Sequence, residues 1–311
     1  MSIYFEKAGL QTSIQDAGRK GLMHLGISNS GAMDNHSLRL ANWLVDKSMD
    51  SPLLEITLVG PTICFEATMT IAVCGATFDL HLNGAPVPNN ETINISKGDV
   101  LVFGQLRGGA RAYLAFAGNI TMEPTLKSYS THLTTLFGGF KDRQINSGDR
   151  LEVLSNAITP YKKLPKEFDV FYSGNYLLRC VSTVESALFS LHQSTQFYSL
   201  KYTVTNECNR MGLRLSGEAI HFDNKIEITS SGLSQGSIQI PPSGQPIISS
   251  VDGQTIGGYP RIANIISVDL PLLGQLKPGD RLGFAFVSQS FAEQQLMAIH
   301  NRYEGIGMNA S

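Results

Sequence analysis

The chain has 311 residues, of which 42% are hydrophobic and 16% are charged, and its formal net charge at pH 7 is −2. This length suits one large or two modest domains with a sizeable core. Without a basic cluster the chain cannot displace phosphate counterions, which argues against nucleic-acid binding. The N-terminus lacks the pattern of a signal peptide, and no apolar run of about 18 residues predicts a transmembrane helix.

The first predicted element is a helix over residues 34–46, with Asp34 as its candidate N-cap and leucines at helical spacing. Short β-branched segments follow, cut by Gly, Pro, Asn and Asp, with apolar residues at alternate positions. They predict strands at residues 69–75, 92–96, 99–104 and 111–118.

The second half of the chain shows the same pattern. A helix is predicted over residues 184–194, then strands at 225–230, 236–240 and 245–249, and a last helix over 288–303. So many short strands with so few helices indicate a mainly β protein with a few helices, built as barrels or sandwiches.

Three segments share an apolar-x-x-Gly-Asp-x-Leu pattern: ISKGDVL (95–101), INSGDRL (145–151) and LKPGDRL (276–282). Gly supplies the φ freedom and Asp the local hydrogen bonds of a turn before a strand. Two copies can close two successive barrel-like units, although short turn motifs also recur by chance. We therefore expect an N-terminal domain of residues 1–160 and a C-terminal domain of residues 161–311 with a terminal helix.

Metal and nucleotide motifs are missing from the sequence. The four cysteines form no CxxC pair and the seven histidines no HxH or HxxxH pair, so we expect buried thiols and no metal site. There is no GxxxxGK[ST] loop. Residues 253–258 read G-x-x-x-G-G, but the strand-like text RIANIISVDL follows instead of the helix that a phosphate cradle requires.

Four clusters combine polar side chains with glycine. Arg offers a bidentate fork, and Gln both donates and accepts, so such clusters suit a small polar amide or carboxylate. Turn and cap formation is the structural alternative for each. The clusters are TSIQDAGRKGLMHLG (12–26), NSGAMD (29–34), NECNRMGLRL (206–215) and VDGQTIGGYP (251–260).

Together with LEITLVGPTICFE and GSIQIPPSGQPIISS, these clusters resemble, in order from about residue 3 to 285, the biotin-dependent carboxyltransferase-like family, also called allophanate hydrolase subunit 2. That family includes KipA and the C subunit of bacterial 5-oxoprolinases. The resemblance implies two cyclophilin-like β-barrel domains in a cytoplasmic protein. It also implies a hetero-oligomer with a KipI-like B subunit and a LamB/YcsF-like A subunit.

The implied activity is that of an ATP-dependent amide or lactam hydrolase, a 5-oxoprolinase whose assembled complex opens 5-oxoproline to L-glutamate. ATP would bind at least partly to a partner in that complex, consistent with the missing P-loop. One alternative is a carboxyltransferase that acts on urea or a related amide with carboxybiotin; another is a non-catalytic KipA-type partner of a KipI-like kinase inhibitor. No biotin-attachment sequence is present, so we expect no covalent biotin on this chain.

The family motifs carry over to named residues of this chain. Asp252, Gln254 and Arg210 are expected to be catalytic, with Asp252 and Gln254 holding the amide and Arg210 or Arg19 meeting a carboxylate or carboxybiotin. The expected substrate-binding residues are Gln15, Asp16, Arg19, Ser30, Asp34, Asn209, Gly257, Gly258 and Tyr259; Gly31, Thr255 and Pro260 stand in the same motifs.

Two segments depart from the family pattern. Tyr129 stands where many members have arginine, and LRCVSTVE (178–185), which includes Thr183, lacks a Gly and two Pro of the usual text. A changed substrate or reduced activity is one interpretation of these departures, and harmless drift in a surface loop is the other.

Overall fold

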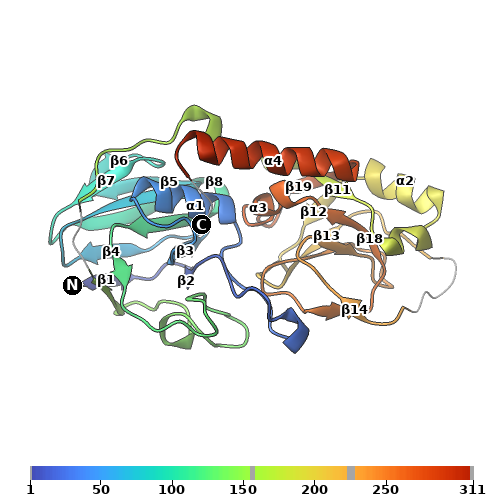
Figure 1. Cartoon of the computed structure of the whole chain (residues 1–311), viewed down its shortest axis with the longest axis horizontal. Helices are drawn as coiled ribbons and strands as arrows, with labels where there is room; N and C mark the ends of the chain where they lie inside the picture. Colours follow the sequence, from blue (N-terminus) through green and yellow to red (C-terminus); the bar gives the residue numbers. More distant parts are fainter. Residues whose placement is uncertain (1, 155–157, 223–227, 309–311) are drawn as a thin grey trace. The chain divides into compact units, whose positions relative to one another are not determined.

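The computed structural model describes residues 2–154, 158–222 and 228–308. The chain forms two compact units. The first contains the residues up to Arg19 and Ser30–Tyr172, and the second contains Lys20–Asn29 and the residues from Ser173 on. The protein is mainly β with a few helices, as predicted (Figure 1).

The first unit is a ten-stranded curled sheet in the order β2-β3-β8-β4-β1-β10-β9, with β5 pairing β6, β7 and β8 (Figure 1). Alternate residues of these strands, such as Ile3 and Phe5 of β1, are fully buried in one apolar core. The strands are β1 (Ser2–Lys7), β2 (Gln11–Gln15), β3 (Leu53–Thr57), β4 (Thr62–Phe65), β5 (Met69–Leu82), β6 (Ala85–Val87), β7 (Thr92–Ile95), β8 (Val100–Phe116), β9 (Asn119–Ile120) and β10 (Arg150–Leu154).

The strand β8 replaces two predicted strands. Residues 99–104 and 111–118 were expected to be separated by a turn, but β8 runs through both and pairs with β5 along its length. The glycines between them form an irregularity instead: the register shifts opposite Gly108, and Gly109 has a φ of 76°. A β-bulge of this kind bends a strand without ending it.

The three Gly-Asp segments form the same turn. Gly98, Gly148 and Gly279 have φ values of 95°, 90° and 90°. In each turn the Asp carboxylate accepts the backbone N–H three residues earlier, at 2.7, 2.7 and 3.0 Å. In each turn the Gly N–H donates to the backbone C=O of one residue in a neighbouring segment, and the Asp C=O accepts the N–H of the same residue. These residues are Phe65, Phe5 and Val204, respectively. The repeat predicted from the sequence is thus a shared structural motif, and it precedes the strands β8, β10 and β19.

The helix predicted over residues 34–46 is α1 (Asn35–Leu44). Asp34 is its N-cap and accepts the N–H of Ser37 at 2.9 Å, a contact that typically contributes about 1 kcal/mol. Leu38, Ala41 and Leu44 form its buried face. The other helical turns of this unit are η2 (Phe140–Asp142) and η3 (Lys166–Phe168).

The second unit is a closed barrel in the order β11-β18-β15-β16-β13-β12-β19, so the expected barrel is confirmed here (Figure 1). β11 and β19 pair in parallel and the other neighbours are antiparallel. Its strands are β11 (Asn175–Val181), β12 (Tyr202–Val204), β13 (Gly212–Ser216), β15 (Ser237–Gln239), β16 (Ile247–Ser249), β18 (Arg261–Ile265) and β19 (Arg281–Phe286); β14 (Ser231–Gly232) and β17 (Ile256–Gly257) form a separate ladder.

The predicted helix over residues 184–194 is wrong in its extent. A 3-10 turn, η4 (Val184–Leu188), is followed by α2 (Leu191–Ser199), because the Ser190 side chain caps the N–H of Gln193 and begins a new helix there. Phe197 of α2 stacks on Phe284 with 4.6 Å between ring centroids. Burying such a side chain contributes about 1.5–3 kcal/mol.

The predicted strands at 236–240 and 245–249 are β15 and β16. Residues 225–227 of the predicted strand 225–230 lie outside the described residues. The last predicted helix is α4 (Gln289–Gly305), capped by Ser288. Shorter helices of this unit are η1 (Met23–Leu25), η5 (Ser267–Asp269) and α3 (Leu270–Leu273).

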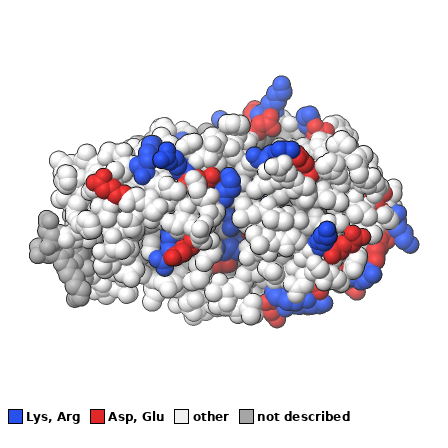
Figure 2. All heavy atoms as spheres, turned by 180° about the vertical axis from the view of Figure 1, so that it is seen from behind, with Lys and Arg blue, Asp and Glu red and all other residues white. Residues whose placement is uncertain are grey.

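Charged side chains are sparse and mixed in sign on the face seen in Figure 2, where Lys and Arg alternate with Asp and Glu over a largely uncharged surface. Among the described residues, none of the helices has the length and apolar character needed to span a membrane.

Candidate functional site

The loop between β16 and β18 carries Asp252 and Gln254, two of the three predicted catalytic residues. Its first turn is closed by the N–H of Gly253, which donates to the C=O of Ser250 at 3.0 Å. The N–H of Asp252 donates to the C=O of Arg210 at 2.8 Å. The loop is therefore tied through its backbone to residues 206–212, which also contain predicted site residues.

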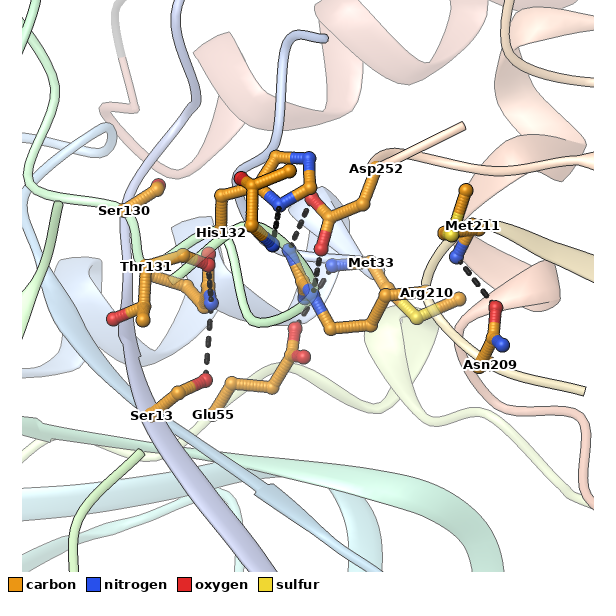
Figure 3. Close-up of polar contacts among 12 residues, drawn as sticks. Ser13, Met33, Glu55, Ser130, Thr131, His132, Asn209, Arg210, Met211 and Asp252 are labelled. Carbon is orange, nitrogen blue, oxygen red and sulfur yellow. Dashed lines mark hydrogen bonds and ion pairs between the residues drawn. The ribbon is translucent and has the colours of Figure 1, made fainter. Parts of the chain in front are cut away.

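Arg210 and Asp252 form a buried ion pair (Figure 3). Nε of Arg210 donates to Oδ2 of Asp252 at 2.8 Å, and Nη2 donates to Oδ1 at 3.2 Å. The side chains are 4% and 0% exposed, so neither charge is solvated by bulk water. Both oxygens of Asp252 thus accept hydrogen bonds from Arg210, and the pair locks the two loops together.

Asn209 forms a turn beside this pair. Its side-chain oxygen accepts the N–H of Met211 at 2.8 Å and that of Gly212 at 3.3 Å (Figure 3). This is the local hydrogen bonding by which Asn stabilises a turn. Asn209 itself is exposed, while the Ser250 hydroxyl at the start of the loop between β16 and β18 is buried without a hydrogen-bond partner in the described residues.

The rest of the loop divides into buried and exposed residues. Thr255 and Pro260 are buried, whereas Gln254, Gly258 and Tyr259 are exposed, Tyr259 by 45%. The strand predicted after Gly258 is present as β18. The exposed amide, phenol and backbone groups are the ones that a small polar ligand can reach.

In the first unit, Gln15 and Asp16 hold the segment 128–131. The Gln15 amide donates to the hydroxyl of Ser13 and the C=O of Thr131, both at 3.0 Å. The Asp16 carboxylate accepts the Ser128 hydroxyl at 2.7 Å. It also accepts the backbone N–H groups of Tyr129 and Gly18 at 2.6 and 2.8 Å, respectively. Both side chains are buried and satisfied internally, which is the geometry of a scaffold.

Arg19 is also buried, at 1% exposure. Its guanidinium donates to the C=O of Thr125 at 3.2 Å and to the C=O of Ser130, and lies 4.5 Å over the ring of Phe137. Contact with a substrate carboxylate, expected from the sequence for Arg19, remains a prediction; in this geometry the guanidinium organises the segment 125–137.

The segment 30–34 packs against the turn at Asp16. A Cβ at Gly31, whose φ is 87°, would lie 2.8 Å from the backbone nitrogen of Gly18, so glycine is required there. Ser30 has a φ of 53°, and its hydroxyl is buried without a hydrogen-bond partner in the described part of the chain. Asp34 faces the helix as its cap, so its structural role is established and its substrate contact is still a prediction.

Sequence reasoning missed a buried polar network under this segment. Oε2 of Glu55 accepts the Met33 N–H at 2.8 Å (Figure 3). It also accepts the Tyr113 hydroxyl at 2.9 Å, and Oε1 lies 3.7 Å from Nε of Arg111. Burial, together with the charge of Glu55, raises the pKa of Tyr113 well above its ordinary value. The signal was a glutamate inside the apolar run LLEIT and an Arg and Tyr at alternate positions of RAYLAF, which the register brings beside it.

The two departures from the family pattern have structural roles. The Tyr129 side chain packs against the apolar core of the first unit. Thr183 caps η4, and its hydroxyl donates to the C=O of Arg261 at 2.8 Å. Within the described ranges, no group of three or more His, Cys, Asp or Glu side chains is arranged to hold a metal ion.

Comparison with known proteins assigns the class. Residues 25–286 match the family described as carboxyltransferase domain, subdomain A and B, so the chain belongs to that family. The chain is 34% identical to the C subunit of the Escherichia coli 5-oxoprolinase, over 95% of this chain and 98% of the relative. It is 33% identical to the C subunit of the Haemophilus influenzae 5-oxoprolinase over 89% of each chain. The protein is thus homologous over most of its length to an enzyme subunit.

A solved structure shares the same architecture. The urea amidolyase of Kluyveromyces lactis superposes with a TM-score of 0.90 and 30% identity, covering 99% of this chain. This chain spans only 20% of that much longer one. The similarity therefore concerns one region of the amidolyase.

Proposed function

We propose that this protein is the C subunit of an ATP-dependent 5-oxoprolinase, which opens the lactam of 5-oxoproline to L-glutamate. The observation that carries the proposal is the similarity to the Escherichia coli protein, 34% identical over 95% of this chain and 98% of the relative. Because both chains align nearly end to end, the resemblance extends beyond a shared fold to the whole polypeptide.

The chemistry that the site supports is stabilisation of charge on an amide oxygen. Attack on a lactam carbonyl moves negative charge to that oxygen, and fixed N–H donors stabilise it. Gln254 and the backbone at Gly258 are exposed and available for this task. Asp252 contributes through Arg210 in this proposal, because a direct contact with the amide would require their ion pair to open. The paired side chains hold the loop on which Gln254 stands.

The remaining components of the proposal belong to the complex. ATP binds at least partly to a partner protein, and the partners are a KipI-like B subunit and a LamB/YcsF-like A subunit. We place the complex in the cytoplasm and regard both units of this chain as variants of the cyclophilin-like barrel. The closed barrel of the second unit supports the last point.

Reconstitution tests the proposal directly. The purified chain is combined with its KipI-like and LamB/YcsF-like partners, ATP and 5-oxoproline, and the release of glutamate is measured. Glutamate should appear only when all three proteins and ATP are present. No glutamate from a complex whose assembly has been verified by size-exclusion chromatography would refute the proposal.

A substitution at Gln254 tests the site. Gln254→Ala removes an exposed amide, so we expect turnover to fall by at least tenfold, the loss of about 1.4 kcal/mol of transition-state stabilisation, with unchanged unfolding. Gln289→Ala, which removes another exposed glutamine at the start of α4, is the control and should retain full turnover. Equal turnover of the two variants would remove Gln254 from the catalytic residues.

A second candidate is carboxyl transfer to urea or a related amide from carboxybiotin. The 0.90 TM-score with urea amidolyase and the family description favour it. With a biotin carboxylase and a biotinylated carrier supplied, labelled bicarbonate should then be incorporated into the amide substrate. Formation of glutamate from 5-oxoproline without biotin would favour the oxoprolinase activity over carboxyl transfer.

A further inference from the structure

Gln239 is a largely buried residue whose side-chain amide the proposed mechanism does not use. It is the last residue of β15 and is 8% exposed. Its side-chain carboxamide makes no hydrogen bond within the described part of the chain, unlike Gln15 and Gln245, whose amides are bonded internally. Among the described residues, its Oε1 and Nε2 are not among the buried polar atoms that lack a partner, so the amide end of this otherwise buried side chain reaches solvent and is open to a ligand.

The backbone of Gly257 lies directly beside this amide. A Cβ on Gly257 would be 2.6 Å from Nε2 of Gln239 and 3.5 Å from its Cδ. Glycine at this position therefore leaves the carboxamide in place, and any side chain would push it aside. Gly257 belongs to the loop that carries the exposed residues Gln254, Gly258 and Tyr259.

The two cross-strand neighbours of Gln239 present no uncommitted charge. Its cross-strand neighbour Arg261 donates to both oxygens of Glu185 and to the C=O of Gly232, so that guanidinium is committed to internal acceptors. The other neighbour is the apolar Ile247. Without an uncommitted charge, this position suits a neutral polar group better than an ion.

We propose that Gln239 is a substrate-binding residue that recognises the amide group of a lactam; this inference rests on the proposed function. A carboxamide presents one acceptor and two donors in one plane. A lactam is held in the cis form, so its N–H and C=O lie on the same side and form two hydrogen bonds with such a group. A trans amide presents them on opposite sides and forms only one.

Ligands that differ by one N–H test the contact. In the assembled complex, 2-pyrrolidinone and N-methyl-2-pyrrolidinone are compared as competitive inhibitors of 5-oxoproline turnover. The wild type should prefer the N–H lactam, and Gln239→Ala should lose about tenfold of that preference, roughly one hydrogen bond. The KM for 5-oxoproline should rise in Gln239→Ala with kcat little changed. Gln289→Ala should keep the wild-type values.

The outcomes separate the two proposals. Turnover of 5-oxoproline with an unchanged inhibitor preference in Gln239→Ala overturns the role of Gln239 and leaves the oxoprolinase proposal standing. If the wild-type complex shows no turnover, the amide signals of Gln239 are followed by NMR in the purified chain. They are identified by their loss in Gln239→Ala, and a shift with 2-pyrrolidinone but not with its N-methyl analogue supports the inference, whereas no shift overturns it.

Gly257→Ala provides an independent test. The φ of Gly257 is outside the left-handed region, so the new methyl group acts through its contact with the Gln239 amide. We expect Gly257→Ala to weaken 2-pyrrolidinone inhibition in the wild type and to add nothing in the Gln239→Ala background. Additive effects would show that Gly257 is needed for another reason and would contradict the pairing.

Discussion

At the scale of single residues, the motifs predicted which side chains matter but not how they are used. Asp16 and Arg19 read as ligands in the sequence, because a carboxylate and a guanidinium near glycines suit a polar substrate. In the structure both are buried and bonded to the segment 125–131. Such long-range partners cannot be inferred from local spacing. The Glu55 network was missed for the same reason.

The Arg210–Asp252 ion pair leads to a prediction about stability. Removing one buried partner leaves the other charge uncompensated, so Arg210→Met or Asp252→Leu should each lower the free energy of unfolding by about 3–5 kcal/mol. The double variant should lose less free energy of unfolding than the sum of the losses in the two single variants. Urea denaturation of all three variants measures this.

An exposed ion pair in the same barrel provides the control. Glu207 and Arg214 lie 3.4 Å apart with side chains 78% and 57% exposed. The variants Glu207→Leu and Arg214→Met should each change stability by less than about 1 kcal/mol. Equal losses for the buried and exposed pairs would contradict the assigned role of burial.

At the scale of elements, the predictions succeeded where local chemistry decides the conformation. The Gly-Asp turns and the capped helix α1 depend on nearby residues and were found as expected. The helix over 184–194 failed because the capping side chain of Ser190 outweighed the apolar spacing. The break between the two parts of β8 failed because pairing with β5 carries the strand through its glycines.

The turn at Asp149 predicts an acid-sensitive contribution to stability. Hydrogen bonds from Arg143 and the charge of its guanidinium hold the pKa of Asp149 at about 2, below its ordinary value of 3.8. The stabilisation is therefore complete above about pH 4 and is lost as the pH falls toward 2. Asp149→Asn should cost about 2 kcal/mol at pH 7 and progressively less below pH 4.

Urea denaturation of the wild type and Asp149→Asn at pH 7 and at pH 2.5 measures how much the cost of the substitution falls with pH. Arg143 donates to both oxygens of Asp149, at 2.6 and 2.9 Å. In an Arg143→Met background the pH dependence of the Asp149→Asn effect should shrink. A cost that stays constant between the two pH values would show that the turn depends on the shape of the side chain and not on its charge.

Replacing the glycines of two turns by alanine should lower stability by different amounts. Gly148 and Gly31 both have φ near 90°, but a Cβ at Gly148 meets nothing within 4 Å. Gly148→Ala should therefore cost only the backbone term, about 1–2 kcal/mol, and Gly31→Ala clearly more, because its Cβ would meet the backbone of Gly18. Thermal denaturation compares them, and an equal loss would contradict the packing of the segment 30–34.

At the scale of the whole molecule, the proposed function divides the work between this chain and its partners. The sequence holds no P-loop, so ATP should leave the melting temperature of the isolated chain unchanged and raise that of the assembled complex. Differential scanning fluorimetry with and without millimolar ATP measures both. A rise in the melting temperature of the isolated chain with ATP would show that this protein has a nucleotide-binding site.

Residues 20–29 have a consequence for biosynthesis. They are translated before residues 30–172 of the first unit, but they belong to the compact unit whose other residues begin at Ser173. At about 5–20 residues per second, on the order of ten seconds separates the synthesis of the two. The second unit is therefore completed by a segment that was synthesised well before the rest of that unit, and an interrupted chain leaves that segment without the residues of its native unit.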